Sequence, residues 1–167
     1  MSSIVEDNLM EAFCGESQAN RKYAACSVKA IEDGFPNVGR LFKAASEAEA
    51  IHASRHLDAA NKVKSTAENL EAAVAGEVHE STVMYPRMLK EAEGGHPDVI
   101  RTFTFACEAE KIHAEHYKEA LAAVKSGKDL NINKVLLCQV CGNIAYDSLP
   151  ALCSICGATS AAFTEIK

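Results

Sequence analysis

Glutamate and histidine recur in this chain at a spacing that could hold metal ions. A Glu-x-x-His step occurs twice, once in each half of an internal repeat, and another glutamate precedes each step at the same distance. The two sets are Glu16, Glu49 and His52, and Glu77, Glu110 and His113. Two single glutamates and two Glu-x-x-His steps, one from each of four helices, form the ligand set of a carboxylate-bridged dinuclear metal site. We therefore expect the chain to hold two metal ions.

The candidate ligands share helix faces with apolar residues. At helical spacing, Leu41 and Ala45 lie on the same stripe as Glu49 and His52. A single glutamate on a helix is usually exposed, but several carboxylates on apolar stripes would be costly to bury without a compensating positive charge. Two divalent ions would supply that charge.

A fifth carboxylate makes the two halves of the repeat unequal. Glu80 follows Glu77 by one turn on the same face, whereas the equivalent residue of the first half is Ala19. Oxygen ligands favour ferric iron, and imidazole suits the ferrous ion. We therefore expect one metal to exchange Glu80 for His52 when its redox state changes.

Helical periodicity, interrupted by glycine and proline, divides most of the chain into four elements. We expect helices over residues 4–32, 37–64, 66–93 and 98–125, the third with a capped start at Thr66-Ala67-Glu68-Asn69. These helices predict an all-α four-helix bundle over residues 1–126. A polar linker over residues 127–134 then leads to a small β-rich domain over residues 135–167.

The connection between the second and third helices is short. In the bundle typical of dinuclear sites these two helices run in the same direction, so the chain would have to return along a helix of about 40 Å. About five residues reach less than ~18 Å. We therefore favour a homodimer with exchanged helix pairs. An up-down-up-down bundle would also fit the short connection.

Four cysteines near the C-terminus form two Cys-x-x-Cys-Gly knuckles separated by a short segment, and they are Cys138, Cys141, Cys153 and Cys156. Four thiolates at this spacing make a closed tetrahedral site for zinc or for one iron ion. A domain this small needs the metal in order to fold. Such knuckles more often hold zinc, but a redox-capable dimetal site in the same chain favours iron.

The combined motifs resemble the rubrerythrin family over nearly the whole chain. The resemblance rests on the segment from Ala12 to Asn20, on the two acid–histidine sets with Glu80, on Met84-Tyr85-Pro86, and on the four knuckle cysteines. It implies a ferritin-like bundle with an oxo/carboxylate-bridged di-iron site, followed by a rubredoxin-like domain with one iron ion. It also implies that Glu80 and His52 are alternative ligands, and that Tyr23 and Tyr85 hydrogen-bond the ligand carboxylates.

The activity implied by this resemblance is that of a non-haem di-iron peroxidase, which reduces hydrogen peroxide to water. Electrons would come from an external NAD(P)H-dependent reductase or a rubredoxin, because the chain has no glycine-rich dinucleotide fingerprint. Oxygen reduction at the same site and ferroxidase-type iron handling are alternatives. A pure electron carrier would leave the buried acids unexplained.

Composition limits the possible binding partners of the protein and its location in the cell. A net charge of −6 without basic runs argues against nucleic acid, and no apolar run is long enough for a membrane span. The N-terminal residues lack the pattern of a signal peptide, so we expect a cytoplasmic protein. Cys14, Cys26 and Cys107 match no ligand position, and we expect them to be small buried residues.

Overall fold

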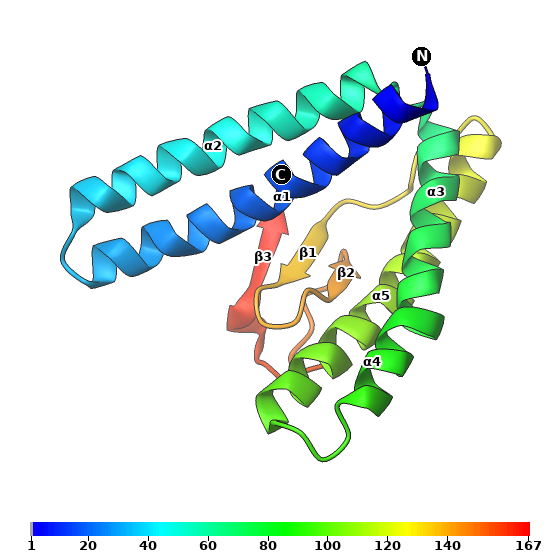
Figure 1. The fold of residues 1–167 in the computed structure, drawn as a ribbon. Helices are drawn as coiled ribbons and strands as arrows, with labels where there is room; N and C mark the ends of the chain where they lie inside the picture. The colour runs from blue at the N-terminus through cyan, green and yellow to red at the C-terminus, as the bar shows by residue number, and fades with distance from the viewer. Residues whose placement is uncertain (1) are drawn as a thin grey trace. The chain divides into compact units, whose positions relative to one another are not determined.

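The computed structural model describes residues 2–167, and the chain divides into two compact units, Met1–Lys64 and Ser65–Lys167. The first unit contains helices α1 (Ser3–Glu32) and α2 (Pro36–Ala59) (Figure 1). The second contains α3 (Thr66–His79), the π-helical segment η1 (Glu80–Met84), α4 (Tyr85–Glu91), α5 (Pro97–Lys125) and a small sheet. The predicted fold class, helices followed by a small β-rich metal-knuckle domain, is confirmed.

Helices α1 and α2 pack directly against each other over their length. Gly34, with φ of 86°, makes the turn between them, and Pro36 starts α2 at a position where a helix needs no amide proton. A Cβ added to Gly39 would lie 2.6 Å from Ile31 Cγ1, so glycine permits this close approach of the two helices. The buried Ser27 hydroxyl donates to the Gly39 carbonyl at 2.8 Å and fixes the contact.

One predicted helix end and one predicted helix cap differ from the structure. The second helix ends at Ala59 rather than near residue 64, and Asn61 follows it with the left-handed φ of 50°. The third helix begins at Thr66 with Ser65, rather than the predicted Thr66, as its N-cap, and the Glu68 amide donates to the Ser65 hydroxyl at 3.4 Å. Ser65 and Glu68 form a capping box, which satisfies amides that a helix start otherwise leaves unpaired.

The predicted third helix is interrupted by the π-helical turn η1. In this turn the Tyr85 amide donates to the Glu80 carbonyl, and Pro86 has no amide proton to offer to the next carbonyl, that of Ser81. The Cys107 thiol of α5 donates to the Ser81 carbonyl at 3.5 Å. A side chain from the neighbouring helix therefore bonds a backbone group that neither Tyr85 nor Pro86 of its own helix bonds.

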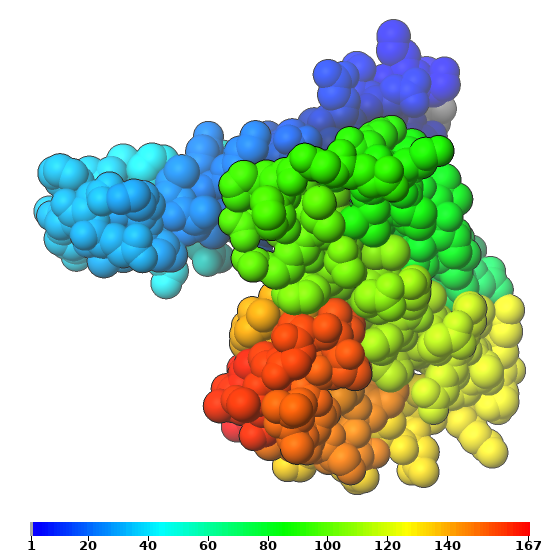
Figure 2. Space-filling model, turned by 90° about the horizontal axis from the view of Figure 1, so that it is seen from below, coloured from blue at the N-terminus to red at the C-terminus, as the bar shows by residue number. Residues whose placement is uncertain are grey.

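The C-terminal module is a three-stranded antiparallel sheet of strands β1 (Val135–Cys138), β2 (Ile144–Tyr146) and β3 (Phe163–Ile166), in the order β2-β1-β3. Leu136 and Cys138 of the central strand are buried. Figure 2 shows this module, in orange and red, packed against the yellow-green atoms of α5, in agreement with the contacts between α5 and β2.

The cysteines outside the knuckles are only partly as predicted. Cys107 is buried, as expected, but Cys14 and Cys26 of α1 are exposed. The prediction was wrong for these two because α1 packs against α2 alone within its unit and so buries one face only. Among residues 2–167, no helix is both long and apolar enough to cross a membrane.

Candidate metal centres

The first acid–histidine set comes together between α1 and α2. Potential ligand atoms of Glu16, Glu49 and His52 all lie within 4.8 Å of one another. His52 Nδ1 lies 3.0 Å from Glu49 Oε2, as expected for two residues one turn apart on a helix. The side chain of His52 is 52% exposed, so this cluster is an open half-site on the surface of the helix pair.

The second set comes together between α3 and α5 in the same arrangement. Glu77, Glu110 and His113 offer ligand atoms within 4.8 Å of one another. His113 Nδ1 lies 2.8 Å from Glu110 Oε2 and 3.7 Å from Glu77 Oε2. In both sets the Nδ1 atom of the histidine faces the carboxylates, which identifies Nδ1 as the nitrogen available to a metal.

The electrostatics of the second set favour a bound cation. Burial and then the neighbouring Glu110 carboxylate raise the pKa of Glu77 to about 7. Glu77 Oε2 is also buried without a hydrogen-bond partner among the residues that the structure describes. In the first set, a hydrogen bond with Glu49 and then burial raise the pKa of Glu16. In each set one carboxyl, Glu16 or Glu77, therefore resists ionisation, and a divalent cation bound beside it would favour its charged form and give the buried Glu77 oxygen a partner.

His113 connects the second set to the cysteine module. Its Nε2 lies 2.9 Å from the carbonyl oxygen of Gly142, the glycine of the first knuckle. A carbonyl can only accept, so Nε2 carries the proton and Nδ1 keeps a free lone pair for a metal. His116, one turn later, makes a similar contact of 3.1 Å to the Ile144 carbonyl and packs on the Tyr146 ring at 4.1 Å.

Three other predicted site residues lie outside these clusters. Glu80 begins η1 and does not join either group of close ligand atoms. Tyr85 lies near the second set: burial first, and then the charges of Glu110 and Glu80, raise the pKa of its phenol. Tyr23 packs against the Phe42 ring at 6.0 Å between centroids. Among the described residues, neither tyrosine forms a hydrogen bond to a carboxylate, so their role as partners of the ligand carboxylates stays a prediction.

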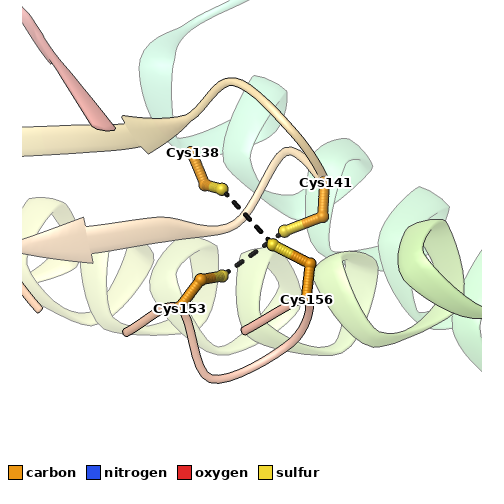
Figure 3. Close-up of side chains that lie close together, drawn as sticks. All are labelled: Cys138, Cys141, Cys153 and Cys156. Carbon is orange, nitrogen blue, oxygen red and sulfur yellow. Dashed lines mark hydrogen bonds between the residues drawn. The ribbon is translucent and has the colours of Figure 1, made fainter. Parts of the chain in front are cut away.

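The four knuckle cysteines converge on one point (Figure 3). The Sγ atoms of Cys138 and Cys156 are 3.8 Å apart, and those of Cys141 and Cys153 are 3.5 Å apart. A disulfide would require about 2.05 Å. A tetrahedron of metal–sulfur bonds of about 2.3 Å has edges of about 3.8 Å, which fits these separations.

Backbone amides favour the thiolate form of one of these cysteines. Burial by itself would raise the pKa of Cys153, but hydrogen bonds from the Cys156 and Ile155 amides lower it to about 6. Burial raises the pKa of Cys141 and Cys156. A buried group of thiols, one of them readily ionised, is suited to a metal that binds all four as thiolates.

Two groups that join the two centres have no strong signal in the sequence. These are the Gly142 carbonyl, which contacts His113, and the His116 side chain, which contacts the Ile144 carbonyl. The only sequence signal for His116 is that it follows His113 by one helical turn, which places both rings on one face of α5.

Two acid–histidine sets on helices and a four-cysteine knuckle define the class of carboxylate-bridged dimetal proteins with a thiolate-bound metal domain. The chain belongs to the rubrerythrin family, whose sequence model matches residues 7–121. It is a ferritin-like di-iron protein with a rubredoxin-like centre, and the acid–histidine sets and the cysteines are its candidate iron ligands.

Individual relatives agree with this assignment. The chain is 36% identical to rubrerythrin-2 of Clostridium acetobutylicum, over 93% of each protein. It is 32% identical to nigerythrin of Nitratidesulfovibrio vulgaris, over 95% of this chain and 84% of that protein. Structures of nigerythrin in partially reduced and in fully reduced, all-ferrous states each match with a TM-score of 0.57 and 30% identity, over 97% of this chain and 86% of theirs.

Proposed function

We propose that this protein is a non-haem di-iron peroxidase that reduces hydrogen peroxide to water with electrons relayed through its four-cysteine iron centre. The proposed di-iron ligands come from both acid–histidine sets and η1, and they are Glu16, Glu49, His52, Glu77, Glu80, Glu110 and His113. An external NAD(P)H-dependent reductase or a rubredoxin is the proposed electron donor.

The observation that carries this proposal is the contact between His113 and Gly142. One nitrogen of His113 faces the carboxylates of its set, and the other bonds the knuckle that holds Cys138 and Cys141. A storage site has no need for electrons to return to it. A thiolate-bound metal joined by one hydrogen bond to a ligand of the dimetal site supports a reaction in which electrons return after each turnover.

Reduction of one hydrogen peroxide to two waters consumes two electrons and two protons. When bound, the iron pair would supply the two electrons by passing from ferrous to ferric. Tyr85, with its raised pKa, keeps its phenolic proton near the carboxylates and can donate a hydrogen bond there. His113 is held in its Nε2-protonated form by Gly142, so its orientation does not change between turnovers.

A complete site requires both acid–histidine sets, and we propose that exchanged helix pairs of a homodimer bring them together. The first unit alone leaves large apolar side chains uncovered, including Leu41 at 70% and Val28 at 58% exposed. Leu41 was expected on the buried stripe of its helix. A two-helix unit with such faces needs further helices to cover them, and we propose that the α3–α5 pair of a second copy does so.

The test is a single-turnover reaction without oxygen. The iron-loaded protein is fully reduced and mixed with one equivalent of hydrogen peroxide, or with one equivalent of O2, while the ferric–thiolate absorption is followed. We expect the visible band to return much faster with hydrogen peroxide than with O2, because the oxidised di-iron site draws electrons from the thiolate-bound iron.

The other outcomes point to the alternative activities. A faster reaction with O2 would make the protein an oxygen reductase. Oxidation at the dimetal site with no return of the thiolate band would remove the electron relay and favour ferroxidase-type iron handling.

A further inference from the structure

Asn143 directly follows the glycine of the first knuckle and lies inside the cysteine module. It is 4% exposed. Its backbone carbonyl accepts from the Cys138 amide at 2.8 Å, which fixes the residue beside the first knuckle. Its side-chain Nδ2 reaches the second knuckle, where it lies 3.6 Å from Cys153 Sγ and 3.4 Å from Ser154 Oγ.

The chemistry of the sulfur determines which end of the amide faces it. A metal-bound cysteine is a thiolate, which has no proton and can only accept a hydrogen bond. The NH₂ group of Asn143 must therefore point to Cys153, because the amide oxygen would meet the anion with a repulsive dipole. Asn143 Oδ1 is then left buried without a hydrogen-bond partner among the described residues. Leucine, which has a similar volume, would avoid that loss, so the asparagine is not explained by packing.

We propose that the Asn143 side-chain amide sets the reduction potential of the four-cysteine iron centre, raising it through an N–H···S hydrogen bond to Cys153. This inference rests on the proposed function only in that iron occupies the cysteine site. The inference adds Asn143 as a residue that determines how readily the four-cysteine iron centre accepts an electron.

The direction of the effect follows from charge. Reduction of the centre adds one electron and no proton, so the iron with its four thiolates changes from a net charge of −1 to −2. The added charge lies partly on the sulfurs, and a donor aimed at a sulfur stabilises the more negative form. Hydrogen bonds to the sulfurs are one of the means by which proteins raise such potentials.

The position of Asn143 relates this effect to the electron relay. The peptide group between Gly142 and Asn143 contributes the carbonyl that bonds His113 Nε2 at 2.9 Å. The same residue therefore contacts a ligand of the four-cysteine site through its side chain and adjoins the bond to the dimetal site through its backbone. A higher potential eases reduction by the external donor and lowers the driving force for transfer to the di-iron site.

The test is a redox titration of the full-length, iron-loaded Asn143→Leu variant, followed by the ferric–thiolate absorption. At the midpoint of the unmodified protein, we expect the ferrous-to-ferric ratio of the variant to be lower on the order of tenfold, which equals about 59 mV for one electron. Ser154→Ala is the matched control, because it removes the other partner of the same amide. Its potential should be unchanged.

An unchanged potential in Asn143→Leu, with its ferric–thiolate band intact, would overturn the proposal. A second measurement decides the question if that variant does not bind iron. In the unmodified protein loaded with zinc, the NMR signals of the Asn143 NH₂ group should show one proton shifted downfield and protected from solvent exchange. Two equivalent, rapidly exchanging protons would also refute it. Neither readout involves peroxide turnover, so failure of this proposal is distinct from failure of the peroxidase.

Discussion

The Glu77 carboxyl has a different charge with and without a bound metal. Its pKa is raised from 4.5 to about 7 by burial and by Glu110. Between these two values the folded protein holds a proton that the unfolded chain has released. The stabilising effect of that proton is complete below pH 4.5 and is lost as the pH rises through about 7. A divalent metal replaces the proton, so metal affinity should rise over the same window.

We therefore expect the stability of the metal-free protein to fall as the pH rises from 4.5 to about 7, and Glu77→Gln to flatten this dependence. The glutamine is neutral at every pH and keeps the shape of the protonated acid. At about pH 8 the metal-free variant should therefore melt at a higher temperature than the metal-free parent. The measurement is thermal unfolding after chelation, with the exposed Glu93→Gln as the control. A parent protein that becomes more stable through this window would contradict the assignment.

At the level of the helices, the two halves of the repeat form the same hydrogen bond between paired helices with different residue types. The Ser46 hydroxyl of α2 donates to the Asn20 carbonyl of α1 at 2.9 Å. At the equivalent positions of the second half, the Cys107 thiol of α5 donates to the Ser81 carbonyl of η1 at 3.5 Å. In the first half, Asn20 Nδ2 adds a bond of 2.7 Å to the Ser46 carbonyl. The second half has the weaker contact at the turn that carries Glu80.

Cys107→Ala should lower the free energy of unfolding by about 1–3 kcal/mol, because it leaves the buried Ser81 carbonyl without a donor. Cys107→Ser is the matched variant, since serine is the residue that makes this contact in the first half, and it should lose less. Burial raises the pKa of the Cys107 thiol, so the group keeps the proton that it donates. Denaturant unfolding of both variants measures the difference. Equal losses for alanine and serine would show that volume, and not the hydrogen bond, matters at this position.

For the whole molecule, exchange of helix pairs can be tested by complementation. In an exchanged dimer, each di-iron site takes Glu16 from one chain and Glu77 from the other. Mixing Glu16→Gln chains with Glu77→Gln chains would then create one site with both substitutions and one site with none. If each chain built its own site, every site would carry one substitution.

We expect each variant alone to lack peroxide turnover, and a mixture refolded together to recover on the order of a quarter of the parent activity. Turnover of the mixture, with dimer mass checked by light scattering, is the measurement. The control is a mixture of the parent with the Glu16→Gln, Glu77→Gln double variant. In an exchanged heterodimer of these two chains, every site lacks either Glu16 or Glu77. If the mixture is as inactive as each variant alone, all the ligands of each di-iron site come from one chain.

Much of the candidate site could be predicted because its signals are local or repeated. The single helical turn from Glu110 to His113 places both side chains on one helix face, and Cys-x-x-Cys-Gly places two sulfurs on one turn. The internal repeat then indicated which distant acids belong together. Helix ends were less predictable, as at Ala59, where a left-handed Asn61 follows the helix. Pro86 was a sequence signal for the π-helical turn η1. A proline alone, however, does not determine how the backbone hydrogen bonds of the helix rearrange around it.

The sequence by itself determined which residues can bind metal, because residue type and spacing along a helix or turn depend on neighbours in the chain. Only the tertiary structure decided how the centres are joined. His113 and Gly142 are separated by 29 positions, as Cys107 and Ser81 are by 26. Asn143 reaches Cys153 across 10 positions. Contacts of this kind depend on how folded elements pack, and no helical or strand periodicity encodes that packing. These three contacts determine the tautomer of His113, the hydrogen bond at the π-helical turn and the donor to the Cys153 thiolate.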